Sequence, residues 1–376
     1  MLIAGILLTV VDNIINETLK TNGFFWLAIG SFVFILAFLI FQLWKKNIIC
    51  DEEKIYNVTT LNILMNLCLI FAFILVLMSL YVVMQIAGNV ALIFVNSTAI
   101  RNEYLDRESQ GTIFSIIQLF LGINFYCFYC LFPVAIKNKC SRIWIKLGLV
   151  LLIRLFSSLV TMSKDLFLMD CVILISAFAV QSNGFKDEIK FVKKYIVYFL
   201  TLIVALLVVT SMQRGYTEQQ RYNNYTDAVF GTIQEYMSVP IVGFSVLISN
   251  PSVNAMGDQC LRPIINVLSY LGLTEHSELI QQAMFEDINV YSMFGNMYND
   301  FGFTGIIIFS LLFGFFFGLC FYKGQSNSLS RLVVNSIILM IMFFGYYDFK
   351  VIQTVYLFVM LYAIVFEKLI AGKLYK

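Results

Sequence analysis

Residues 61–87 run LNILMNLCLIFAFILVLMSLYVVMQIA, 27 residues without one Asp, Glu, Lys or Arg. A bilayer core about 30 Å thick is crossed by roughly 17–25 apolar residues in a helix. This stretch therefore predicts a transmembrane helix. Further apolar runs of this kind lie at 24–44, 112–136, 143–163, 166–180, 195–211, 302–322, 332–346 and 351–370. The short stretch Met1–Val11 is a tenth candidate. The span at 61–87 is also compatible with a continuation toward Phe94, with Gly88 as a candidate break.

The composition agrees with a bilayer environment. Of the 376 residues, 60% are hydrophobic and 13% are charged, whereas a soluble domain has roughly 25% charged residues. So few charges exclude a soluble enzyme, a disordered chain and a nucleic-acid binder. Long alternating strand patterns are missing. The predicted fold class is therefore all-α, a polytopic integral membrane protein with about ten transmembrane helices.

The basic residues predict the orientation, because cytoplasmic loops of membrane proteins are enriched in Lys and Arg. One alternating set of segments carries 15 of the 25 Lys and Arg residues, and the opposite set carries 8. We expect the first set to be cytoplasmic. Its members are 45–54, 137–142, 186–194, 323–331 and 368–376.

One predicted loop is much longer than the rest and faces outward. It divides the chain into transmembrane helices in 1–211, a large extracytoplasmic loop at 212–301, and three C-terminal transmembrane helices in 302–376. Within the loop, apolar residues recur at helical spacing over 227–248. We expect a helix there that lies in the membrane interface with its apolar face down and a kink at Pro240.

A polar stripe marks the predicted span 143–163 and the turn after it. Arg154, Ser157, Ser158, Thr161, Lys164 and Asp165 share one helical face. A charge near mid-membrane needs a partner or a cavity, and Asp170 on the next span is the expected partner of Arg154. Two interpretations stay open: a buried ion pair that joins two helices, or a cationic site, formed by Arg154 and Lys164, that opens outward.

Two arginines follow the predicted span 195–211. Arg214, Glu218 and Arg221 are spaced i, i+4, i+7. Guanidinium groups on one helical face suit a phosphate or pyrophosphate, whose oxygens match their fork of donors. The alternative is a solvated helix end with a Glu–Arg pair.

A third cluster, Asn289 to Gly305, leads into the span 302–322. Asp300 lies near the predicted start of this helix. There it serves either as a cap for free N–H groups or as a general base. Gly314 and Gly318 have the small-xxx-small spacing that permits close helix contact.

Signals for cofactors are weak. His276 is the only histidine, and Cys127 and Cys130 lie inside a span without further ligands. Phosphate-binding glycine motifs are also missing. We therefore expect no metal and no cofactor.

Several of these residues resemble a known family, the bacterial oligosaccharide repeat-unit polymerases of the O-antigen polymerase (Wzy-like) type. The layout is similar, with about ten spans and one large outward loop before the last three. The segment Tyr298-x-Asp300-Phe301-Gly302-x-x-Gly305 resembles the family's aromatic–Asp–Phe–Gly motif after that loop. Arg214-Gly215, followed by Tyr236-x-x-x-Pro240, is also similar. Where many members carry Ser-Arg, this chain has Ser163-Lys164.

The resemblance implies an integral-membrane glycosyltransferase in the bacterial cytoplasmic (inner) membrane. Such an enzyme polymerises undecaprenyl-pyrophosphate-linked repeat units into O-antigen or capsule at the outer face. The expected partners are the lipid-linked oligosaccharide, membrane lipid and a chain-length regulator protein, without nucleic acid. The lipid-pyrophosphate leaving group needs cations, and the acceptor hydroxyl needs a base.

The residues expected to do this work fall into two sets. The catalytic set is Asp300, Arg214 and Arg221. The substrate-binding set is Lys164, Arg154, Tyr298, Tyr236 and Arg101. Two other classes stay open. A flippase for lipid-linked oligosaccharide, or another transporter, would place charges in several spans, and a membrane acyltransferase would use a catalytic His.

Overall fold

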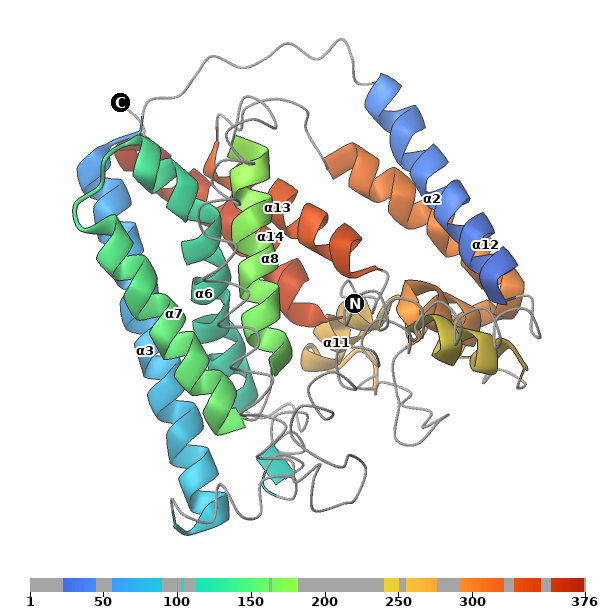
Figure 1. Cartoon of the computed structure of the whole chain (residues 1–376), viewed down its shortest axis with the longest axis horizontal. Helices are drawn as coiled ribbons and strands as arrows, with labels where there is room; N and C mark the ends of the chain where they lie inside the picture. The colour runs from blue at the N-terminus through green and yellow to red at the C-terminus, as the bar shows by residue number, and fades with distance from the viewer. Residues whose placement is uncertain are drawn as a thin grey trace, which may run out of the picture. The chain divides into compact units, whose positions relative to one another are not determined.

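The structure is a computed structural model. It describes residues 23–44, 56–89, 100, 103–104, 113–161, 164–181, 240–249, 255–275, 291–320, 328–345 and 353–374. The elements that these residues form are α-helices (Figure 1). Their bounds are α2 Gly23–Trp44, α3 Val58–Ala87, α6 Ile113–Lys137, α7 Ile143–Thr161, α8 Lys164–Gln181, α11 Arg262–Tyr270, α12 Ser292–Cys320, α13 Leu329–Phe344 and α14 Thr354–Leu374, with a further helix at Pro240–Ser249.

Five of these helices are long and apolar enough to cross a membrane, so the chain is a multi-pass membrane protein. They are α2, α3, α6, α12 and α14. Shorter apolar helices occupy Leu166–Gln181, Pro240–Ser249 and Leu329–Phe344. The expected spans at 195–211 and Met1–Val11 lie outside the described residues, so the total of about ten stays a prediction.

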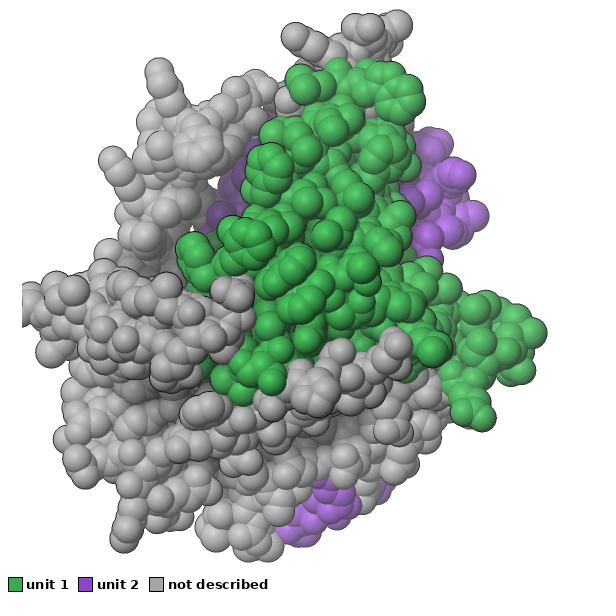
Figure 2. All heavy atoms as spheres, turned by 90° about the vertical axis from the view of Figure 1, so that its right-hand side faces the viewer, with its two compact units in different colours: residues 1–50, 230–323, 341–357 green, residues 51–229, 324–340, 358–376 purple. Residues whose placement is uncertain are grey.

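The chain forms two compact units, each assembled from segments that are far apart in the sequence. Unit 1 contains residues 1–50, 230–323 and 341–357, and unit 2 contains 51–229, 324–340 and 358–376. Figure 2 colours the two units, and unit 1 forms a continuous body in that view. The first of the described helices, α2, thus belongs to the same unit as α12, which follows the predicted large loop.

In unit 1, α2 lies along α12 (Figure 1). Gly314 and Gly318, the small residues singled out in the sequence, explain how closely the two helices approach each other. A Cβ on Gly314 would collide with the carbonyl oxygen of Phe34, and a Cβ on Gly318 would lie 2.9 Å from that of Phe38. Gln42 Nε2 donates to the Gly318 carbonyl oxygen at 2.9 Å. The expected close helix contact is therefore confirmed.

In unit 2, α3 packs against α6 and α7, and α6 also packs against α8. Asn57 caps α3, because its Oδ1 accepts from the backbone N–H of Thr59 at 3.1 Å. At the other end, Gly88 adopts φ +69°, and its N–H donates to Met84 O at 2.9 Å. A left-handed glycine is a usual helix end, so the candidate break at Gly88 is present, and the continuation toward Phe94 lies outside the described residues.

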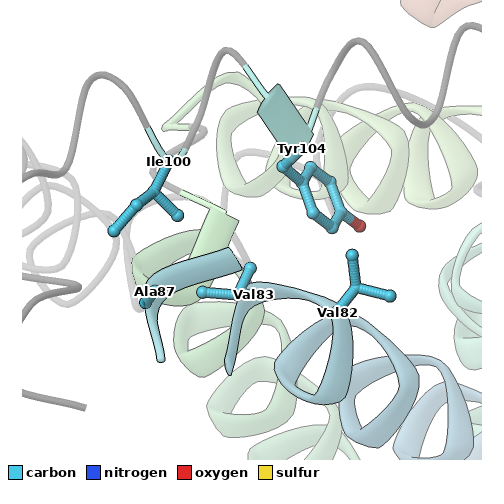
Figure 3. Close-up of a cluster of buried hydrophobic side chains, with 5 residues drawn as sticks. All are labelled: Val82, Val83, Ala87, Ile100 and Tyr104. Carbon is cyan, nitrogen blue, oxygen red and sulfur yellow. The ribbon is translucent and has the colours of Figure 1, made fainter. Parts of the chain in front are cut away.

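A small apolar cluster covers this end of α3 (Figure 3). Val82, Val83 and Ala87 from the last turns of α3 pack with Ile100 and Tyr104. The Tyr104 hydroxyl lies 3.1 Å from Ser79 Oγ. Burying these groups holds residues 100 and 104 against α3, with the one polar group of the cluster hydrogen-bonded.

Candidate functional site

A break in α12 lies within the aromatic–Asp–Phe–Gly segment. Phe301 (φ −142°, ψ 27°) and Gly302 (φ +61°, ψ −144°) are not helical, so a first helix ends at Asp300 and a second begins at Phe303. Gly302 occupies a region that only glycine adopts readily. Gly305 closes the corner, because a Cβ there would collide with the Met297 carbonyl oxygen. These two glycines explain the spacing of the motif.

The carboxylate of Asp300 binds the loop that precedes α11. Its Oδ1 accepts from the backbone N–H of Gln259 at 3.0 Å, and its Oδ2 accepts from that of Cys260 at 2.8 Å. The backbone N–H groups of Ala255 and Met256 donate to the carbonyl oxygens of Asn299 and Asp300, at 3.0 and 3.1 Å. Four hydrogen bonds therefore fix the loop 255–260 to the break.

This geometry differs from the capping role expected for Asp300. The carboxylate does not cap the helix that follows it, but the backbone of a loop 40 residues earlier in the sequence. The side chain is fully buried and each oxygen already accepts one N–H. Such a carboxylate positions the loop. A direct role as general base stays a prediction.

Cys260 shares this environment. Burial raises the pKa of its thiol well above the ordinary value, and the negative charge of Asp300 raises it further. The thiol therefore stays protonated near neutral pH and unreactive. Its state reports on whether the loop remains bound to Asp300.

Asn299 lies next to Asp300 and has an unusual side chain. It is fully buried, and neither Nδ2 nor Oδ1 has a hydrogen-bond partner. Most buried polar groups are paired, so each exception needs an explanation. This amide is an unused donor and acceptor at the last turn before the break.

The expected ion pair in the other unit is present. Arg154 on α7 donates to Asp170 on α8 through two nitrogens, Nε to Oδ2 and Nη2 to Oδ1, the latter at 3.0 Å. Both side chains are buried. The guanidinium also lies 4.1 Å from the ring centroid of Phe125 and 5.6 Å from that of Tyr126. Aromatic faces add cation–π attraction to the bidentate pair.

No family model, curated protein or solved structure matches this chain.

The Arg154–Asp170 pair favours the interpretation as a buried ion pair that joins helices over that of a cationic site that opens outward. Ser157 and Ser158, from the same stripe, are buried with it. A guanidinium held by two carboxylate oxygens and two rings joins helices α6, α7 and α8. The alternative role of Arg154 in substrate binding stays a prediction.

Of the remaining predicted site residues, the structure describes only some. Tyr298 is buried near the break, with its hydroxyl 3.5 Å from Ile248 O and its ring 5.1 Å from that of Phe303. Lys164 is the first residue of α8, and its side chain is not described. The others, Arg101, Arg214, Arg221 and Tyr236, lie outside the described residues.

The predicted interfacial helix at 227–248 differs in its described part. In Pro240–Ser249, Phe244 and Leu247 are fully buried. The Phe244 ring lies 6.5 Å from that of Phe294, in the first helix of α12. This apolar face therefore packs on protein rather than on lipid. Pro240 is the first residue of the described helix, and because residues 227–239 lie outside the described residues, the kink stays a prediction.

Proposed function

We propose that this protein polymerises lipid-pyrophosphate-linked oligosaccharide units at the outer face of a bacterial cytoplasmic membrane. The observation that carries the proposal is the position of the break in α12. The second helix, Phe303–Cys320, has a length of about 27 Å at 1.5 Å per residue. This matches the roughly 30 Å hydrocarbon core, so the break lies near a membrane boundary, on the side predicted to be extracytoplasmic.

A site at that boundary suits a substrate whose lipid tail stays in the bilayer while its pyrophosphate and sugars lie outside. The break offers a loop fixed by Asp300 and the unpartnered amide of Asn299. Arg214 and Arg221 belong to the same predicted extracytoplasmic loop and supply the cations that a pyrophosphate leaving group requires. In this proposal Asp300 is a positioning residue, and a base role would require the carboxylate to become accessible.

The position of the break also bears on the transporter alternative. Transporters with discontinuous helices bind substrate near the bilayer midplane, where two half-helices meet. Here the second helix alone is long enough to cross the membrane. A midplane site at this break is therefore disfavoured.

Deletion of the gene, with complementation, tests the proposal. We expect the deletion strain to display single repeat units outside without a polymer ladder, and the intact gene to restore the ladder. Membrane-impermeant periodate and hydrazide label glycans on spheroplasts and detect the outer units. If the units remain inside the cell, the protein is a transporter and the proposal fails.

Conservative variants then test whether Arg214 and Arg221 bind the pyrophosphate. Arg214→Lys and Arg221→Lys keep the charge but lose the fork, so each should slow polymerisation by about 10²–10³-fold at unchanged protein abundance. Arg262→Lys, in the same predicted loop, is the matched control and should retain the ladder. A full ladder in both site variants would contradict pyrophosphate binding by these residues.

A further inference from the structure

The surface of α11 has an apolar stripe on its outside. Leu261, Ile264, Ile265 and Leu268 recur at i, i+3, i+4 and i+7, which places them on one helical face. Leu261 is 41% exposed and Ile264 53%. On the opposite side, Asn266 is buried. The helix therefore turns its apolar face out and a polar side chain in, the reverse of a helix on a water-soluble protein.

The residues on either side of α11 continue this pattern. Met256 is 75% exposed, Leu271 67% and Leu273 68%, whereas Gln259 is fully buried. We call residues 256–273 the apolar hairpin. Exposed apolar surface concentrated on so short a segment is typical of a contact with lipid or protein.

The apolar hairpin is continuous with the exposed apolar surface of a candidate membrane span. A Cβ on Gly257 would lie 3.6 Å from Leu261 Cδ1 and 3.7 Å from the ring of Phe301. The Phe301 ring is 42% exposed and stacks on Phe309, with centroids 6.0 Å apart. These rings belong to α12, a candidate membrane span. The stripe of α11 therefore begins where the apolar side of the span ends.

Aromatic residues indicate the membrane depth at which the loop 255–260 meets the break in α12. Trp26, near the start of α2, stacks on Phe303 with centroids 4.2 Å apart, and Tyr298 contacts the same ring at 5.1 Å. Trp and Tyr concentrate at the membrane–water interface. The four hydrogen bonds at Asn299 and Asp300 hold the loop 255–260 at this level, so α11 starts at headgroup depth.

We infer that the apolar hairpin inserts Leu261, Ile264, Leu271 and Leu273 into the headgroup–acyl boundary of the leaflet beside the α12 break. The occupant of this face is membrane lipid. Interfacial helices bury their apolar face in this way and keep polar groups on the other side. The hairpin thus anchors the loop that Asp300 binds, and this holds whether or not the protein is a polymerase.

Photocrosslinking in the full-length protein tests this inference without any activity assay. Benzoylphenylalanine is placed at Ile264 or Leu273, and the protein is reconstituted in nanodiscs of phosphatidylethanolamine and phosphatidylglycerol. Leu312, 57% exposed on the span α12, is the lipid-facing control. Glu275, an exposed acidic residue just beyond the hairpin, is the water-facing control. Intact mass spectrometry after irradiation detects an added phospholipid.

We expect phospholipid adducts at Ile264 and Leu273 in yields within about threefold of Leu312 and at least about fivefold above Glu275. Yields at Ile264 and Leu273 no higher than at Glu275, with adducts present at Leu312, would overturn the inference. A crosslink to a second copy of the chain, seen as a dimer, would overturn it as well, because the face would then be a protein interface.

Discussion

Removal of the Asp300 carboxylate should release the loop 255–260 from the break in α12. In Asp300→Ala the N–H groups of Gln259 and Cys260 lose their acceptors, which lie at 3.0 and 2.8 Å. A hydrogen bond to a charged group contributes about 1.5–3 kcal/mol. Loss of both should reduce the free energy of local opening by about 3–6 kcal/mol. The backbone bonds from Ala255 and Met256 remain and keep the rest of the fold intact.

The Cys260 thiol measures this opening directly. A change of 3 kcal/mol raises the open population by about 100-fold. The rate of alkylation by iodoacetamide at Cys260 should rise by at least that factor, followed by peptide mass spectrometry at pH 8. Loss of the Asp300 charge also lowers the raised pKa of this thiol, which acts in the same direction. In the unchanged protein the Cys260 thiol stays buried and protonated, so its rate at pH 8 should lie far below that of an exposed thiol.

Two controls separate local release from unfolding. Glu275→Gln removes an exposed acid from the same unit and should leave the Cys260 rate unchanged. The buried thiols Cys68 and Cys171, in the other unit, should stay unlabelled in Asp300→Ala. An unchanged Cys260 rate in Asp300→Ala would refute the positioning role. If polymerisation were nevertheless lost, Asp300 would act on the substrate as a base.

Three further substitutions test the packing. Arg154→Ala should lower thermal stability and membrane abundance, since the buried Asp170 carboxylate left without its partner destabilises the protein by about 3–5 kcal/mol. Adding Asp170→Ala should restore part of both. Normal abundance of the single variant would contradict the pairing. Gly302→Ala should destabilise by about 1–3 kcal/mol because φ +61° with ψ −144° strains any residue with a Cβ, and an unchanged melting temperature would argue against the break. Gly314→Val should separate α2 from α12, because its side chain would meet the carbonyl oxygen of Phe34; disulfide trapping between engineered cysteines on the two helices should then fail.

Much of the membrane architecture could be predicted from the sequence because it depends on local composition. Apolar runs alone predict α2, α3, α6 and α14 to within a few residues. The pairing of Arg154 with Asp170 was predictable as well, since two charges on consecutive spans each need a partner. Gly88, at the end of α3, follows from the same local reasoning.

The break in α12 was not predictable in the same way. The expected span began at 302, whereas α12 begins at Ser292, and all nine residues before the break are buried. The acceptor role of Asp300 depends on a loop 40 residues away, which no local pattern reveals. The apolar stripe of α11 was visible at i, i+3, i+4 and i+7. Its inverted orientation became apparent only from the burial of Asn266 and Gln259.

The pairing of α2 with α12 sets a time constraint on synthesis. Gln42 and the Gly318 carbonyl that it binds are separated by 276 residues. At about 5–20 residues per second, the ribosome needs roughly 14–55 s to travel between them. Throughout that interval the Gln42 side chain lacks the Gly318 acceptor that it has in the folded chain. A nascent chain that stops before Ser292 never makes the helix on which α2 packs, so α2 is left without this partner.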